Sequence, residues 1–242
     1  MDLSNLKRLA GERAIAYVKE GMAIGLGSGS TVYYAIQKLA ERVRAGLRVR
    51  CIPTSRRTEE LALSLGLTLT DFSEVAELDL VIDGADEVDP HCNLIKGGGG
   101  ALLREKIVAS AGKRVIIVVD ETKLVERLGA FPLPVEVLPF GWEATLRRLE
   151  RLGCRAVRRE EDSQPFLTDN GNYILDCHFG EIADPTRLER EIDLIPGVVE
   201  SGLFLGLAER IIVGRAGGTV EELVCPSRIW LGREDSNLQP PG

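Results

Sequence analysis

The chain contains 242 residues, of which 44% are hydrophobic and 28% are charged, and its formal net charge is −7 at pH 7. This length is enough for one large domain or two smaller ones, and the composition is that of an ordinary globular protein. The negative charge argues against non-specific nucleic-acid binding, which needs a basic face, and no apolar run is long enough to cross a membrane. We therefore expect neither nucleic acid nor membrane among its partners.

Five cysteines are spread along the chain without a C-x-x-C pair, namely Cys51, Cys92, Cys154, Cys177 and Cys225. Because their number is odd, a complete disulfide framework is disfavoured. The first residues also lack the apolar core of a signal peptide. These observations predict reduced thiols in a cytoplasmic protein.

The N-terminal third combines a helix, a strand and a glycine-rich turn. Apolar spacing predicts an amphipathic helix over residues 3–19 and a short buried strand over 22–26. The loop Gly27-Ser28-Gly29-Ser30-Thr31 follows, and a second helix begins directly after it. Such a turn before a helix predicts an anion site, because exposed N–H groups and the helix dipole both favour phosphate.

Two other interpretations of this loop are possible. Ser30 or Thr31 can simply cap the helix that follows, which is compatible with an anion site. A dinucleotide-binding fingerprint is disfavoured, because the glycines at 25, 27 and 29 do not form G-x-G-x-x-G and no acidic residue ends a strand at the expected distance. The loop also lacks the Gly-Lys-Ser/Thr end of a Walker A motif.

Three acidic residues follow a later strand. An almost continuous apolar run at 78–82, typical of a sheet covered on both faces, is followed by Asp83, Asp86 and Glu87. Ligands of open α/β sheets bind at the carboxyl ends of strands. Turn formation and helix capping are the alternative roles. We assign these to Glu87, and we expect Asp83 and Asp86 to face a ligand.

Four consecutive glycines, at 97–100, separate Lys96 from a predicted helix. Glycine is costly inside helices and strands, but it suits a loop that presents bare N–H groups to a ligand. Glu105 lies near the start of that helix, where a solvated glutamate that complements the helix dipole is the alternative interpretation. If Lys96, Glu105, Asp83 and Asp86 converge on one pocket, they form a set of groups for proton transfer.

The second half of the chain changes character at a hinge-like segment. The strand at 114–120 is followed by Lys123, which can reach a phosphate or remain an ordinary surface lysine. The Phe131-Pro132-Leu133-Pro134 segment then precedes short strands interleaved with two helices. This order predicts a small α+β domain of ferredoxin-like type. Apolar residues at 203–207 and 211–213 are expected to rejoin the first sheet.

The expected architecture is therefore α/β, with a Rossmann-like, mostly parallel sheet, helices on both faces and a smaller ferredoxin-like α+β domain. We place the α/β catalytic domain at 1–130 and 203–225, and the small domain at 131–202. The segment 226–242 has no apolar period and ends in Pro-Pro-Gly, so we expect a disordered tail.

Five motifs agree in order and spacing with one known family. They are Gly27-Ser28-Gly29-Ser30-Thr31, Asp83-Gly84-Ala85-Asp86-Glu87, Lys96-Gly97-Gly98-Gly99-Gly100-Ala101 with Arg104-Glu105-Lys106, Phe131-Pro132-Leu133-Pro134-Val135-Glu136-Val137, and Thr168-Asp169-Asn170-Gly171-Asn172. Together they closely resemble ribose-5-phosphate isomerase of the A type, over about residues 3–224. The family often has threonine where this chain has Ser28, and its chains usually end soon after the last strand, so the tail is a departure.

The resemblance implies an aldose–ketose isomerase that interconverts D-ribose 5-phosphate and D-ribulose 5-phosphate in the non-oxidative pentose phosphate pathway, with no metal and no cofactor. It implies a phosphate site formed by Ser28, Gly29, Ser30, Thr31 and Lys123, with a weaker indication for Lys7. It implies a sugar site formed by Asp83, Gly84, Ala85, Asp86, Lys96, Gly97, Gly98 and Gly99. It also implies a homo-oligomer, a dimer or a tetramer.

The same resemblance makes Glu105 the base that moves a proton between C1 and C2 through an enediolate. We expect Lys96 to stabilise the developing charge and Asp83 to assist ring opening. Two rival functions remain, a sugar-phosphate-sensing regulator and a CoA-transferase-like enzyme. The regulator needs a DNA-binding domain, and no helix-turn-helix precedes residue 21. The transferase would form a glutamyl thioester that nucleophiles can trap.

Overall fold

The computed structural model describes residues 2–226, and its largest sheet has six strands in the order β15-β14-β6-β3-β1-β2. These strands are β1 (Ala23–Leu26), β2 (Arg50–Pro53), β3 (Leu80–Asp83), β6 (Val115–Asp120), β14 (Arg210–Arg215) and β15 (Thr219–Val224). Every pair is parallel except β14 with β15. The expected mostly parallel sheet is confirmed. The antiparallel strand β15 was not predicted.

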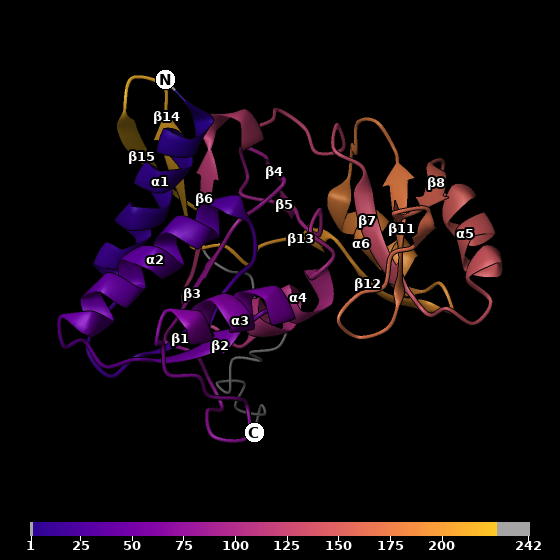
Figure 1. The fold of residues 1–242 in the computed structure, drawn as a ribbon. Coiled ribbons are helices and arrows are strands. Elements are labelled where there is room, and N and C mark those ends of the chain that lie inside the picture. Colours follow the sequence, from indigo (N-terminus) through magenta and orange to yellow (C-terminus); the bar gives the residue numbers. More distant parts are fainter. Residues whose placement is uncertain (1, 227–242) are drawn as a thin grey trace, which may run out of the picture.

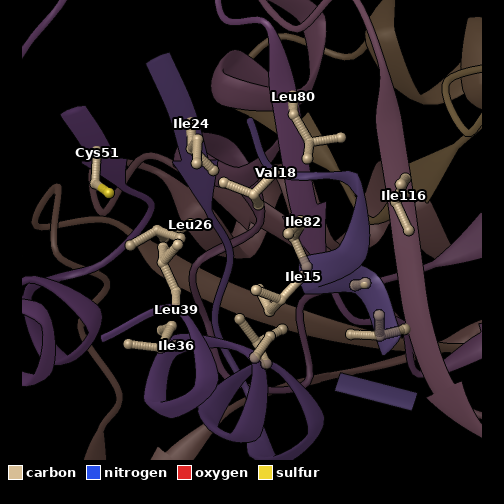
Figure 2. Close-up of a cluster of buried hydrophobic side chains, with 14 of the residues drawn as sticks. Ile15, Val18, Ile24, Leu26, Ile36, Leu39, Cys51, Leu80, Ile82 and Ile116 are labelled. Carbon is tan, nitrogen blue, oxygen red and sulfur yellow. The ribbon is translucent and has the colours of Figure 1, made fainter. Parts of the chain in front are cut away.

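Helices cover both faces of this sheet because successive side chains of a strand point to opposite sides. In β6, Ile116 and Val118 pack into one core, and Ile117 and Val119 pack into the other. The first core is covered by α1 (Leu3–Ala14), the 3₁₀ turn η1 (Ile15–Tyr17), α2 (Ser30–Arg44) and α3 (Arg56–Ser64), and the second by α4 (Leu102–Ser110). Figure 1 shows α1 and α2 side by side on one flank, and Figure 2 shows the aliphatic side chains of the first core.

A separate sheet of four antiparallel strands lies to one side of the main sheet (Figure 1). Its elements are β7 (Leu133–Val137), α5 (Trp142–Glu150), β8 (Arg155–Arg158), β11 (Tyr173–His178), α6 (Pro185–Asp193) and β12 (Val198–Ser201), with a hairpin of β9 (Glu160–Glu161) and β10 (Gln164–Pro165). The strand order β12-β7-β11-β8 and the β-α-β-β-α-β chain order agree with the ferredoxin-like expectation. We propose that residues 131–202 form this small domain.

A third, three-stranded sheet joins the two parts of the chain. It consists of β4 (Glu87–Val88), β5 (Leu94–Ile95) and β13 (Leu203–Phe204). The expectation that 203–207 rejoins the first sheet is therefore wrong. Leu203 and Phe204 pair with β5 instead, and of the two expected segments only 211–213, in β14, lies in the main sheet. The N–H of Lys96 donates to the carbonyl of Gly202 at 2.9 Å, so β13 supports the backbone directly before the glycine loop.

The cysteine prediction needs correction. Cys92 and Cys225 form a disulfide across a sequence separation of 133 residues, whereas Cys51, Cys154 and Cys177 are free and buried. Cys92 lies in the tight turn between β4 and β5, and Cys225 directly follows β15, so the pairing arises because β15 joins the edge of the main sheet. Such a long separation leaves no local pattern in the sequence.

Between residues 2 and 226, no helix has the length and apolar character needed to cross a membrane. The expected tail lies outside the described residues, apart from Pro226.

Candidate active site

The expected site residues meet at the carboxyl edge of the main sheet, beside the strand ends of β1, β3 and β6. A cavity of about 140 Å³ lies there. It is lined by Lys7, Ser28, Gly29, Ser30, Thr31, Gly84, Ala85, Asp86, Lys96, Gly97, Gly98, Gly99, Glu105 and Lys123. Asp83 lies behind this lining with only 1% of its surface exposed. The cavity therefore gathers segments that are up to about a hundred residues apart in the chain.

A buried ion cluster forms one wall of the cavity. The Nζ of Lys96 lies 3.0 Å from Oδ2 of Asp83 and 3.1 Å from Oε2 of Glu105, and it donates to the carbonyl of Gly84 at 2.6 Å. Glu105 is in the first turn of α4, as the sequence indicated, but only 4% of it is exposed. The alternative of a solvated first-turn glutamate is therefore excluded.

Burial and the mutual charges of its members set the acid–base properties of this cluster. Burial, followed by the nearby carboxylate of Asp83, raises the pKa of Glu105 to about 8, against the opposing effect of Lys96. Burial likewise raises the pKa of Asp83, although the Lys96 ammonium opposes it. For Lys96 burial alone would lower the pKa, but Asp83 and Glu105 outweigh it and hold the pKa above its ordinary value. At neutral pH the cluster thus contains a lysine cation beside a glutamic acid that readily loses its proton.

The loop before α2 closes the opposite end of the cavity. Its Gly29 has a φ of +118°, a conformation that side-chain-bearing residues rarely adopt. A Cβ at Gly27 would lie 1.9 Å from Oδ1 of Asp83, so only glycine permits this close approach. Because α2 begins at Ser30, its first N–H groups have no partner within the helix, and Ser30 and Thr31 line the cavity.

Ser28 has a different environment from the neighbouring hydroxyls of the loop. Its Oγ lies 3.0 Å from Oγ1 of Thr54, 2.7 Å from Oγ of Ser55 and 2.9 Å from Oγ1 of Thr58. Its N–H donates to Oδ1 of Asp83 at 3.2 Å. Thr58 also donates to the carbonyl of Gly27 at 3.0 Å. This hydroxyl cluster anchors the loop to α3, and sequence analysis did not identify it, because the motif Thr54-Ser55 reads locally as an ordinary helix start.

Two lysines reach the cavity from separate elements. Lys7 belongs to α1, and Lys123 ends the 3₁₀ turn η2 (Glu121–Lys123) that follows β6. Both side chains are partly buried. Their positions favour an anion at this end of the cavity, since the opposite end already carries the carboxylates of Asp83, Asp86 and Glu105.

Two residues near the site differ from expectation. Glu87 is buried in β4, where its carboxylate accepts the N–H groups of Gly129 and Phe131 at 2.6 and 2.5 Å. Glu87 therefore holds the backbone at residues 129–131 through hydrogen bonds, rather than capping a turn or a helix. Arg159, which no sequence signal identified, donates from the small domain to the carbonyls of Gly97 and Gly98 at 2.9 and 3.1 Å.

Comparisons with known proteins agree with this geometry. Residues 50–218 match the family model of ribose 5-phosphate isomerase A (phosphoriboisomerase A). The chain is 58% identical to the ribose-5-phosphate isomerase A of Gloeobacter violaceus, over 94% of this chain and 99% of the relative. It is 52% identical to that of Bacillus mycoides, over 90% of this chain and all of the relative.

Solved structures give the same result. A D-ribose-5-phosphate isomerase in complex with phospho-erythronic acid superposes with a TM-score of 0.90 at 39% identity, covering 93% of this chain and 100% of that one. The ribose 5-phosphate isomerase from Plasmodium falciparum superposes with a TM-score of 0.89 at 40% identity, covering 91% and 98%. The sequence, the fold and the cavity together show that this chain belongs to the ribose-5-phosphate isomerase A family.

Proposed function

We propose that this chain interconverts D-ribose 5-phosphate and D-ribulose 5-phosphate through an enediolate. The observation that carries the proposal is the Lys96–Glu105 pair, which is buried at one end of a cavity whose other end is lined by the Ser28–Thr31 loop and two lysines. A five-carbon sugar phosphate has the matching polarity, with a phosphate at one end and the reacting carbonyl carbon at the other.

The phosphate is held by the Ser28–Thr31 loop, the N-terminus of α2, Lys7 and Lys123. Unpaired N–H groups at a helix start favour an anion, and the two lysines supply charge in a protein that is acidic overall. Ser28 acts here chiefly through its hydroxyl cluster, which fixes the loop. Binding at this remote end supplies energy that can be used at the reacting carbons. Ribose without phosphate should therefore have a much lower kcat/KM.

Glu105 removes the proton from one of the two reacting carbons and returns it to the other. A raised pKa suits this task, because a base transfers protons best when its pKa is near the working pH. The ammonium of Lys96, which lies between Glu105 and Asp83, stabilises the negative charge that develops on the enediolate oxygens. The Asp83–Asp86 turn and the Lys96–Gly99 loop bind the sugar hydroxyls, and Asp83 assists opening of the ring.

The decisive experiment follows conversion of ribose 5-phosphate in D₂O, with EDTA present, for the wild type and for Glu105→Gln. Deuterium should enter at the transferred position. The substitution should reduce kcat by about 10²–10⁴-fold, the usual contribution of a general base. Glu59→Gln is the matched control, since Glu59 is also a first-turn glutamate but is exposed. A folded wild type that does not convert the substrate would contradict the proposal.

We also propose a cytoplasmic homo-oligomer, a dimer or a tetramer. The exposed apolar side chains of Leu138, Phe140 and Leu194 on the small domain support self-association, since 49%, 96% and 82% of their surfaces are exposed. Sedimentation of the purified protein tests the oligomeric state, and a monomer at micromolar concentration would contradict it.

A further inference from the structure

A single arginine of the small domain holds the backbone of the glycine loop. Arg159 directly follows β8, and its Nη1 donates to the carbonyls of Gly97 and Gly98 at 2.9 and 3.1 Å. Its Nε and Nη2 donate to the two carboxylate oxygens of Asp176 in β11 at 2.9 and 2.5 Å. A guanidinium bound on both edges has a fixed position, because its planar fork leaves little freedom.

The held carbonyls determine where two amides of the loop point. In a trans peptide the C=O and the following N–H point in opposite directions, and no peptide bond of the described residues is cis. The N–H of Gly98 donates to Oδ2 of Asp86 at 2.8 Å. The N–H of Gly99 has no acceptor within residues 2–226, and Gly99 lines the cavity.

The packing around the loop makes the arrangement rigid. The ring of Phe166 lies 5.7 Å from the Arg159 guanidinium. The same ring fills the space beside Gly100, where a Cβ would lie 2.4 Å from it. The loop is thus confined by Phe166 and Arg159 from the small domain and by Asp86 from the main domain. An N–H group in such a loop needs no reorganisation when charge develops near it.

We propose that Arg159 is a positioning residue, which aims the N–H of Gly99 at the enediolate oxygen by holding the Gly98 carbonyl on the opposite side of the peptide. This inference rests on the proposed isomerase function. It means that the small domain contributes to transition-state stabilisation without touching the substrate. It also explains why position 159 is an arginine. The single ammonium group of a lysine cannot bind both carboxylate oxygens of Asp176 and the two carbonyls at the same time.

The test measures Arg159→Ala and Arg159→Lys in the full chain. Removing one oxyanion donor typically costs about 10²-fold in kcat, so kcat should fall by about that factor while KM changes little. The affinity for phospho-erythronic acid, whose carboxylate resembles the enediolate, should fall in parallel. The affinity for inorganic phosphate should stay unchanged, because the phosphate cradle lies at the other end of the cavity. Added guanidinium ion should partly restore the kcat of Arg159→Ala.

Arg158→Ala is the matched control. Arg158 precedes Arg159 but stacks on Trp142 and Tyr173, at 4.7 and 5.5 Å, and pairs with Glu160. Its loss should leave kcat and the affinity for phospho-erythronic acid unchanged.

If Arg159→Ala does not fold, the same measurements are made on Arg159→Lys, which keeps the aliphatic stem and the positive charge. Unchanged kcat, or a kcat loss without weaker binding of phospho-erythronic acid, would overturn the proposal. An inactive wild type would instead overturn the isomerase function itself.

Discussion

The Nζ of Lys96 lies 3.1 Å from Oε2 of Glu105, and only 3% and 6% of the two side chains are exposed. Lys96 directly follows β5, whereas Glu105 lies in the first turn of α4. The glycine loop between them brings the two side chains together. Burying a carboxylate raises its pKa, and a nearby cation lowers it again. The balance of these two effects sets the protonation state from which the reaction begins.

The pH dependence of activity should reflect the pKa of Glu105. Because the base must be ionised and its pKa is about 8, kcat/KM should rise with pH and level off above about pH 8. Asp83→Asn removes the neighbouring negative charge that helps to raise this pKa, so the inflection should move to lower pH. Initial rates between pH 5 and pH 10 check this, and an inflection that stays in place would contradict the assignment.

The stability of Glu105→Gln should exceed that of the wild type at high pH. The folded pKa of about 8 lies above the ordinary glutamate value of 4.5, so the folded wild type binds more protons than the unfolded chain between these pH values. Its unfolding free energy therefore decreases as pH rises from about 4.5 to about 8, by at most about 1.4 kcal/mol per pH unit.

Glutamine does not titrate, so the advantage of the variant should grow through this range and remain constant above it. Urea unfolding of both proteins at pH 5, 7 and 9 measures the difference. An advantage that shrinks as pH rises would mean that Glu105 is not destabilised by burial of its charge.

Thr58→Val should loosen the phosphate loop. The substitution keeps the side-chain shape but removes the hydroxyl that lies 2.9 Å from Ser28 and donates to the Gly27 carbonyl. Leaving buried polar groups without partners costs roughly 1–3 kcal/mol, and KM for ribose 5-phosphate should rise more than kcat falls. Thr219→Val, at an exposed position of β15, is the control and should change neither. Equal KM values for the two variants would contradict an anchoring role.

Cys225→Ser should reduce the stability of the chain. The disulfide with Cys92 closes a loop of 133 residues, and in the chain-entropy description such a crosslink stabilises the folded state by up to about 5 kcal/mol. Dithiothreitol should lower the Tm of the oxidised wild type and leave the Tm of Cys225→Ser unchanged. Equal sensitivity of both proteins to the reductant would show that this bond does not contribute.

Much of the fold was visible in local patterns. Apolar runs such as those at 78–82 and 114–120 predicted the buried parallel strands, and glycines beside them predicted the ligand loops. These signals are short-range, because burial on both faces and bare backbone each leave a signature within a few residues. The family resemblance then connected Glu105, Lys96 and Asp83 with one reaction.

The sequence by itself determined the mostly parallel sheet, and it predicted the small ferredoxin-like domain, a phosphate loop and a set of proton-transfer residues. Only the tertiary structure decided that Glu105 is buried and that Leu203–Phe204 pairs with β5 outside the main sheet. It also decided that Cys92 and Cys225 form a disulfide and that Arg159 donates hydrogen bonds to the glycine loop. Each of these depends on contacts between segments far apart in the chain. The local sequence of one segment does not indicate which distant residue that segment will pack against.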